Sequence, residues 1–533
     1  MNIVCISCNL APAFSRLGHN VRSVTPGPGV VDARTLLADL DAMPDLLFQQ
    51  EHLGDRTFLS HLEEVPCLKA FWALEAHLNV HWHKYYTRLF DVVFTPHLSL
   101  FRHMPPEWTP PRPAPLAMCG HALPWRPHAE RRHAMTFVGR DIPATRPLRS
   151  RFLKLLGPLG LTCRSGVDHA AMLELYADSR VVPNESIAFE VNYRLTESAS
   201  AGACVLTTPV GEDQNRLYTP DREILIYEQS LELLEKTAFL RRRPDIAEKI
   251  GRAAWEATRA RHLPEHRARF VLENLPAAPV RADATALPMT LAQRGRHIHL
   301  PTPRPLLHTL GSADGIEAAA LHLRCLSEGY PGQHTERFIR ARLMHAPVPG
   351  EDELTLAALG HALLRADLPL FQAFWTRLHA ARPIRPEVPG SLYQAGLSLA
   401  DELQTRGRLF QPGLAYQADL MTPETALEAL YMARRYAGDD PEWAYRLHRL
   451  TTRSAALTEV RLEALAALQA SAPDWRNQLE YGCALLDAYS AAEGISILSR
   501  ALVEADALGR GGLARKILLA HRVDSALLND VLP

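Results

Sequence analysis

The 533-residue sequence lacks an apolar run long enough to cross a membrane, since a spanning helix needs about 20 such residues. Its first basic residue, Arg16, lies too far along the chain for the charged start of a secretory signal. It also lacks an excess of charge, because 58 Lys and Arg face 59 Asp and Glu. A polycationic surface for nucleic acid is therefore not expected. We expect a cytoplasmic protein without a membrane span or a nucleic-acid partner.

Cysteine is scarce and scattered: eight residues show no spacing typical of a disulfide framework. Cys5 and Cys8 form a C-x-x-C within an expected strand, Asn2–Leu10, where an odd spacing sends the side chains to opposite faces. A second such pair, which a tetrahedral zinc site would need, is missing. We therefore expect reduced thiols, no metal and no cofactor.

The first 120 residues alternate short apolar runs with helical stretches. After an expected strand, helix and strand within residues 3–24, further strands are expected at Asp45–Gln49, Leu68–Leu74 and Asp91–Thr95. Helices are expected between them at Val31–Ala42 and Leu78–Leu89. This alternation is typical of a doubly wound parallel sheet. The pattern predicts a Rossmann-like lobe over residues 1–120.

A Pro-dense passage from Pro105 to Pro115 precedes a second series of the same kind. Strands are expected near residues 135–140, 161–163, 180–183, 204–208 and 223–227, and helices at 147–156, 169–179 and 191–200. The series predicts a second Rossmann-like lobe over residues 121–275. Two such lobes in tandem predict a cleft where the carboxyl ends of their strands face each other.

The remainder of the chain has few strand signals. Residues 276–311 are rich in Pro, Ala and Arg and are interpreted as a linker or an extension that spans the lobes. Residues 312–533 show helical apolar spacing with short connections, which predicts an array of helical hairpins. Within it, Tyr481-Gly482 and Leu485 pair with Gly494, Leu498 and Ala501 in the positions of a tetratricopeptide (TPR) unit. We predict a TPR-like domain.

The window from Tyr176 to Thr207 carries the most chemistry. It predicts a strand, a polar loop and a helix whose first turns present Asn192, Arg194 and Glu197. The amino end of a helix offers N–H groups and a positive dipole to a diphosphate. A carboxylate one turn further on can accept both hydroxyls of a ribose. An ordinary surface ion pair between Arg194 and Glu197, three residues apart, is the alternative interpretation.

This window resembles the donor-binding stretch of GT-B glycosyltransferases, and most of all the CgeB-like (spore maturation) group. The elements that match that group's pattern are Tyr176, Ser179, Asn184, Arg194, Glu197 and Ala201-Gly202. Four other stretches are similar to further parts of the family, in the same order: Phe71–Leu78, Phe90–Phe94, Phe137–Gly139 and His262–Arg267. The resemblance covers about residues 1–275.

The resemblance implies a GT-B fold and transfer of a sugar from a nucleotide-diphospho-sugar to an acceptor. It implies catalytic roles for His77 and Glu75 near the acceptor, and His77 is expected at the end of a strand, facing the cleft. The donor-binding residues that it implies are Gly139, Arg140, Asn184, Ser186, Arg194, Glu197, Ser198 and Gly202. Without a pair of carboxylates at a strand end, the helix dipole and basic side chains would stabilise the departing diphosphate instead of a metal ion.

Several alternatives stay open at this point. Glu190 and Glu197 are seven residues apart where retaining enzymes have eight, so inverting and retaining chemistry are both open. His77 and His81 lie one turn apart, but the Glu of an H-E-x-x-H zinc motif is absent. The acceptor is expected to be a protein or a cell-surface glycan, with the helical domain recruiting it or a protein partner. A non-catalytic adaptor with a degenerate GT-B half is the competing hypothesis, and epimerisation of a nucleotide-sugar is a third.

Overall fold

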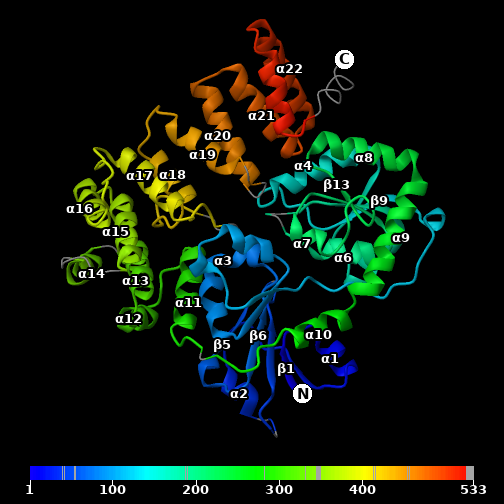
Figure 1. The fold of residues 1–533 in the computed structure, drawn as a ribbon, viewed down its shortest axis with the longest axis horizontal. Coiled ribbons are helices and arrows are strands. Elements are labelled where there is room, and N and C mark those ends of the chain that lie inside the picture. Colours follow the sequence, from blue (N-terminus) through cyan, green and yellow to red (C-terminus); the bar gives the residue numbers. More distant parts are fainter. Residues whose placement is uncertain are drawn as a thin grey trace. The chain divides into compact units, whose positions relative to one another are not determined.

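The computed structural model describes residues 1–523 except 39, 41, 53, 55, 187, 189, 281, 331, 344–349, 412, 414, 415, 453, 455 and 456; the side chains of 342 and 343 are likewise not described. The chain folds into two compact units, each made of two separate segments (Figure 1). Unit 1 comprises residues 1–115 and 271–443, and unit 2 comprises residues 116–270 and 444–533.

Unit 1 is built around a six-stranded parallel sheet with strand order β2-β1-β4-β6-β7-β8. Its strands are β1 (Asn2–Ile6), β2 (Asn20–Val24), β4 (Leu46–Gln50), β6 (Leu68–Trp72), β7 (Val92–Thr95) and β8 (Pro113–Pro115). The helices of this part are α1 (Ala11–Arg16), α2 (Ala33–Ala38) and α3 (Ala76–Tyr86). The central strands are apolar along most of their length because helices bury both faces of a parallel sheet. The predicted Rossmann-like lobe is confirmed.

A small parallel pair of strands in unit 1 was missed in the sequence. β3 (Gly29–Asp32) pairs with β5 (Thr57–Ser60), with Val30 opposite Phe58. The helix expected at Val31–Ala42 is therefore shorter, because the β-branched Val30-Val31 belongs to β3 and α2 begins only at Ala33.

The helical part of unit 1 packs against α3. Its helices are α11 (Ala286–His297), α12 (Arg304–Ser312), α13 (Ile316–Gly329), α14 (Gln333–Leu343), α15 (Asp352–Leu364), α16 (Leu368–Leu378), α17 (Leu392–Thr405) and α18 (Ala426–Arg434). Residues 276–311 hold more helix than expected of a linker, since α11 lies within this stretch and α12 begins in it. Ala286 at the start of α11 belongs to the same core as Phe71 and Tyr86 of the sheet lobe.

A buried ionic network fixes this helical layer. The Glu424 carboxylate accepts hydrogen bonds from Lys84 of α3 (3.1 Å), from Gln293 of α11 (3.2 Å) and from Arg296 of α11. Burial raises the pKa of Glu424, but the cations Lys84 and Arg296 outweigh that effect and hold the pKa well below its usual range. The network therefore adds buried ion pairs to the apolar contacts that already join α3 and α11.

Unit 2 contains a five-stranded parallel sheet with strand order β10-β9-β11-β12-β13. Its strands are β9 (His133–Val138), β10 (Leu161–Arg164), β11 (Ser179–Asn184), β12 (Cys204–Thr207) and β13 (Leu225–Ile226). Its helices are α4 (Pro147–Leu156), α5 (His169–Ala177), α6 (Tyr193–Ser200), α7 (Glu212–Asn215), α8 (Ser230–Arg242) and α9 (Pro244–Arg261), with α10 (Pro264–Glu273) at its boundary. The second predicted Rossmann-like lobe is confirmed.

The last helices of the chain belong to unit 2. They are α20 (Thr458–Ser471), α21 (Trp475–Asp487), α22 (Ala491–Ala507) and α23 (Gly511–Ala520), and α19 (Glu442–Thr451) crosses the boundary. Leu231 of α8 shares a core with Leu479 of α21 and Leu498 of α22. The helical region 312–533 is therefore divided between the two units and does not form one domain. A substantial helical C-terminal region is confirmed.

The hairpin of α21 and α22 has a close helix crossing at its centre. A Cβ at Gly482 would lie 2.6 Å from Leu498 Cγ, and one at Gly494 would lie 2.9 Å from Leu486 Cδ2. Small residues at both positions let the two helices approach each other, as the sequence pattern Gly482, Gly494 and Leu498 suggested.

The Gly251→Ala variant is expected to lower the free energy of unfolding by roughly 1–3 kcal/mol. In α9, a Cβ at Gly251 would overlap the backbone oxygen of Gly202 and lie 3.1 Å from the carbonyl carbon of Ala203, in the turn between α6 and β12. Urea unfolding measures the effect. Gly512→Ala in α23, where a Cβ meets nothing within 4 Å, is the matched control. Equal stability of both variants would contradict the close contact.

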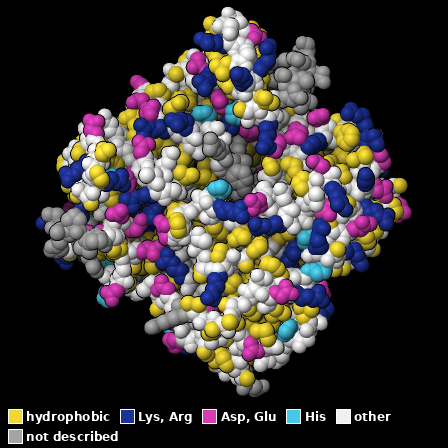
Figure 2. Space-filling view, viewed as in Figure 1, with side chains coloured by type: hydrophobic (Ala, Val, Ile, Leu, Met, Phe, Trp, Pro, Cys, Tyr) yellow, Lys and Arg dark blue, Asp and Glu magenta, His cyan; other side chains and the backbone are white. Residues whose placement is uncertain are grey.

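No helix in the described residues is long and apolar enough to traverse a bilayer. On the face drawn in Figure 2, basic and acidic side chains are interspersed, as the nearly balanced count of charges predicts. All eight cysteines are free thiols, and only Cys163 is exposed.

Candidate functional site

The carboxyl ends of three neighbouring strands of unit 2 place polar groups at one edge of the sheet. Gly139 follows β9, Asn184 ends β11 and Thr207 ends β12. The Asn184 side-chain amide donates to Thr207 Oγ1 at 3.0 Å, which joins the two strand ends. Ligands of open α/β sheets bind at this edge. We call these residues, together with Arg194 and Glu197 of α6, the donor edge.

Helix α6 begins at the donor edge because Asn192 caps it. The side-chain oxygen of Asn192 accepts a hydrogen bond from the Leu195 N–H at 3.2 Å. The side-chain NH₂ of Asn192 donates to Asn184 Oδ1 at 3.0 Å. A capping Asn satisfies one of the free N–H groups of the first turn. The same side chain therefore starts the helix and ties it to β11.

Arg194 lies in the first turn of α6 and reaches across the donor edge. One terminal nitrogen donates to Asn184 Oδ1 at 2.9 Å and the other to the Val138 carbonyl at 3.2 Å. The guanidinium carbon lies 4.1 Å from the centre of the Phe137 ring. Among the described residues, nothing accepts a hydrogen bond from the buried Nε. Arg194 is thus held rigidly with one donor still unused.

Gly139 leaves room for this arginine. A Cβ at Gly139 would lie 3.2 Å from an Arg194 terminal nitrogen and 2.9 Å from the Phe137 ring. Because a side chain at this position would press on the guanidinium, the glycine is required by close packing at the end of β9. Packing against Arg194 and Phe137 therefore accounts for a glycine at this position.

Glu197 lies one turn further along α6 and is only 6% exposed. Its Oε1 lies 3.2 Å from His169 Nε2 at the start of α5. Burial raises the pKa of the Glu197 carboxyl, and the nearby His169 and Arg194 only partly offset that effect. Glu197 is therefore a buried acid facing a histidine, and the alternative of an exposed ion pair with Arg194 does not describe it.

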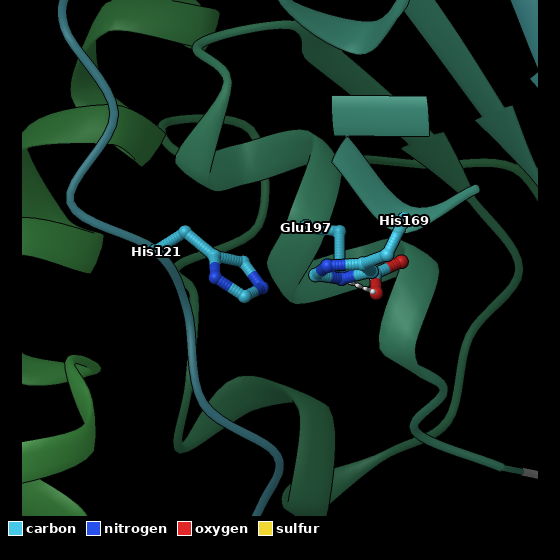
Figure 3. A group of neighbouring side chains, drawn as sticks. All are labelled: His121, His169 and Glu197. Atoms are coloured by element: carbon cyan, nitrogen blue, oxygen red, sulfur yellow. Dashed lines mark hydrogen bonds and ion pairs between the residues drawn. The ribbon is translucent and has the colours of Figure 1, made fainter. Parts of the chain in front are cut away.

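His121 completes this group from the extended segment before β9. Figure 3 shows its ring pointing toward His169 and Glu197. The His121 N–H donates to Ser200 Oγ of α6 at 2.8 Å, and the His121 and His169 ring centres are 5.0 Å apart. Burial, and to a smaller extent His169, lowers the pKa of His121.

His121 and His169 were assigned no role in the sequence analysis. The available signal was position: His169 follows the loop after β10, at the carboxyl edge of the same sheet as Gly139. Asp168 immediately before it caps α5 by accepting from the Ala171 N–H at 2.8 Å. For His121 the sequence offered only a Gly-His step, with no period that could link it to α6.

The other predicted donor residues have varied surroundings. Ser186 Oγ donates to the Glu190 carbonyl at 2.6 Å, and Ser198 Oγ donates back to the Arg194 carbonyl within α6. Gly202 ends α6 with φ 72°, and a Cβ there would lie 2.7 Å from the Trp125 ring. Arg140 is exposed. Ser198 and Gly202 therefore have structural roles in α6 and at its end. Of the predicted donor-binding residues, Gly139, Asn184, Arg194 and Glu197 lie together at the donor edge.

The predicted catalytic pair lies in unit 1, at the start of α3. His77 was expected at the end of a strand, facing the cleft, and the strand position was wrong. It lies within α3, is 2% exposed, and its ring centre is 4.5 Å from that of His97. Glu75 precedes the helix, and its side chain is 28% exposed and 3.5 Å from Arg56. His77 is therefore buried against another ring, whereas Glu75 remains partly accessible to solvent.

Glu51, at the carboxyl end of β4, was missed although it organises this part of unit 1. It accepts hydrogen bonds from the Glu75 N–H (2.8 Å) and Asn79 Nδ2 (2.7 Å), and lies 3.1 Å from His83 Nε2. Burial raises the pKa of Glu51, but the opposite effect of His83 and the Glu75 N–H is larger, so the pKa lies below its usual value. An acidic residue directly after a buried strand was the available signal.

Residues 139–273 match the model of a family described as glycosyl transferase-like. The matched segment is about a quarter of the chain, and it includes the donor-edge residues Gly139, Asn184, Arg194 and Glu197. No curated protein matches the chain.

Solved structures with some likeness include sucrose-phosphate synthase from Thermosynechococcus elongatus, with 12% identity, 51% of this chain and 98% of that chain covered, and a TM-score of 0.38. A glycosyltransferase from Rickettsia africae has 11% identity, coverage of 51% and 97%, and a TM-score of 0.36. AviGT4, a glycosyltransferase of avilamycin A biosynthesis, has 14% identity, coverage of 51% and 96%, and a TM-score of 0.32.

Proposed function

We propose that this protein is a glycosyltransferase that binds a nucleotide-diphospho-sugar at the donor edge of unit 2. The observation that carries the proposal is the position of Arg194 and Glu197 on α6, within the segment that matches the glycosyl transferase-like family. Both side chains are held before any ligand arrives, Arg194 by Asn184 and Val138, and Glu197 next to His169. Such preorganisation is what an electrostatic transition-state site requires.

Arg194 would stabilise the departing nucleoside diphosphate. Its unused Nε donor, and the positive dipole end of α6, offer a hydrogen bond and charge to diphosphate oxygens. Gly139 would act through Arg194, because the missing side chain leaves the space in which the guanidinium lies. In this proposal the leaving group is neutralised without a metal ion, and Ser186 and Arg140 border the same edge.

Glu197 would accept hydrogen bonds from the two ribose hydroxyls of the donor. This role needs the ionised carboxylate, because a protonated acid offers one acceptor fewer. Burial raises the pKa of Glu197. As the pH falls, donor affinity should therefore begin to weaken at a higher pH than it would with an exposed glutamate.

On the acceptor side, Glu75 is the better placed of the two predicted catalytic residues. Its side chain keeps 28% exposure, whereas His77 is 2% exposed. A general base must come within hydrogen-bond distance of the acceptor hydroxyl. The proposal therefore assigns deprotonation of the acceptor to Glu75, with His77 supporting the start of α3.

The helical hairpins, which we propose to be TPR-like, would recruit a protein acceptor, a cell-surface glycan or a protein partner. Stacked hairpins form extended binding surfaces. Large apolar side chains remain exposed at the last two helices and their connection, namely Val503, Leu508, Leu513 and Leu519.

The Glu197→Ala variant tests the donor site. The wild-type chain is screened by thermal shift and calorimetry against UDP-, GDP-, dTDP- and CMP-sugars at millimolar concentration. A ligand at 100 times its Kd stabilises the folded chain by about 2.7 kcal/mol. We expect such stabilisation from one nucleotide class, and its loss in Glu197→Ala.

Glu256→Ala is the matched control, because Glu256 lies on α9 of the same unit and its side chain is 58% exposed. The control should keep the response to the nucleotide-sugar. Absence of binding by all four classes would remove the enzyme proposal and favour the adaptor hypothesis, with the helical hairpins as the functional part. Binding that persists in Glu197→Ala would refute the ribose role.

A further inference from the structure

A compact group of metal-ligating side chains lies beside the donor edge. His121, His169 and Glu197 each offer one ligand atom, and these atoms lie within 4.8 Å of one another. Within the part of the chain that the structure describes, this is the one such group of three His, Cys, Asp or Glu side chains. Figure 3 shows the three side chains converging from the segment before β9, from α5 and from α6.

The backbone anchors of the group are independent of any ligand. The His121 N–H is bound to Ser200 of α6, His169 opens α5 behind the capping Asp168, and Glu197 lies in the middle of α6. The three residues therefore meet because the helices and the incoming segment are packed together. In zinc sites with about 2.1 Å bonds, neighbouring ligand atoms are roughly 3.4 Å apart. His169, whose side chain is 57% exposed, has the freedom to close the remaining gap.

The donor set selects the kind of cation. Two imidazoles and one carboxylate are the ligands of three-residue zinc sites that keep a fourth position open. Imidazole nitrogen disfavours Mg²⁺ and Ca²⁺, which take oxygen ligands.

We propose that His121, His169 and Glu197 bind a zinc-class divalent cation, and that this cation and the nucleotide-sugar exclude each other at Glu197. The second half rests on the proposed function, in which Glu197 accepts the ribose hydroxyls. A carboxylate bound to zinc no longer has both oxygens available for a diol. Zinc would therefore inhibit donor binding, rather than take part in sugar transfer.

The metal half is tested without any nucleotide. The full-length chain, freed of metal by a chelator, is titrated with Zn²⁺ by calorimetry and with Co²⁺ by visible absorption, which reports the coordination geometry. We expect one tight equivalent. His121→Gln and His169→Gln should each weaken it at least tenfold. His133→Gln, which removes another histidine of unit 2, is the control and should leave it unchanged. A first equivalent that is the same in all four proteins would overturn the site.

Competition separates this inference from the proposed function. With the donor class that binds best, Zn²⁺ should raise the apparent Kd of the nucleotide-sugar in proportion to zinc concentration, and His121→Gln should bind the nucleotide-sugar but lose this effect. Zinc binding without any nucleotide binding would refute the proposed function and keep the metal site. Nucleotide binding without a first zinc equivalent would do the reverse. Simultaneous binding of both ligands would overturn the exclusion.

Discussion

Replacing Arg194 with alanine is expected to slow sugar transfer by roughly 10²–10³-fold, the usual loss when one preorganised donor to a developing charge is removed. The guanidinium is clamped by Asn184 and Val138 and stacked on Phe137, so that its unused Nε does not need to reorganise when the diphosphate leaves. The measurement is turnover of the identified nucleotide-sugar, with hydrolysis in place of transfer until an acceptor is known. Arg194→Lys should remain impaired, because an ammonium cannot make the forked contacts.

Loss of structure would mimic this effect, so a second arginine serves as the control. Arg180 of β11 also donates to two backbone carbonyls, those of His128 (3.1 Å) and Arg131 (3.3 Å). It lies near the amino end of the strand, opposite to the donor edge. Arg180→Ala should lose stability and keep turnover per folded molecule. If both variants lose turnover equally, Arg194 has no role beyond structure.

Replacing Tyr489 with alanine is expected to destabilise unit 2 by about 3–5 kcal/mol, the range for removing a large buried aromatic side chain. Tyr489 lies between α21 and α22, is 8% exposed and belongs to the core beneath the sheet of unit 2. Its ring is 5.2 Å from that of Phe152, and its hydroxyl shares a 3.0 Å hydrogen bond with Tyr227. Tyr227 in turn donates to the Asn184 carbonyl at 3.1 Å.

Urea unfolding of two further variants separates packing from hydrogen bonding. Tyr489→Phe removes only the hydroxyl and should cost about 1 kcal/mol. Tyr445→Ala replaces a tyrosine of α19 that is 48% exposed, and should change stability little. A small effect of Tyr489→Ala would mean that α21 and α22 are an appendage, and not part of the hydrophobic core of unit 2.

The sheet lobe of unit 2 was the part of the fold that the sequence predicted best. α4 begins and ends at the expected residues, Pro147 and Leu156, and β9, β11 and β12 lie within a few residues of the expected strands. These elements carry strong local signals: β-branched runs, a proline at the first turn of α4 and a capping Asn192 before α6. The convergence of Asn184 and Arg194 follows from the same local order.

Long-range partners were beyond the reach of local patterns. The stretch 276–311 was interpreted as a linker for its prolines, yet Arg296 within it is buried because Glu424, more than a hundred residues away, pairs with it. His77 was expected at a strand end, but it lies in α3 and packs against His97 of a later loop. His121 meets Glu197 only through the packing of its segment on α6. None of these partners follows from a period or a turn signal.

Each unit is built from two segments that are far apart in the sequence, and this affects folding during synthesis on the ribosome. Lys84 and its carboxylate partner Glu424 are 340 residues apart. At a translation rate of about 5–20 residues per second, Glu424 is synthesised roughly 17–68 s after Lys84. Tyr489 is likewise synthesised long after its partner Tyr227. Neither sheet can therefore complete its core until a much later segment of the chain has been translated. The nascent chain must therefore hold two unfinished lobes at once, and chaperones that shield apolar surface should associate with it until the last helices emerge.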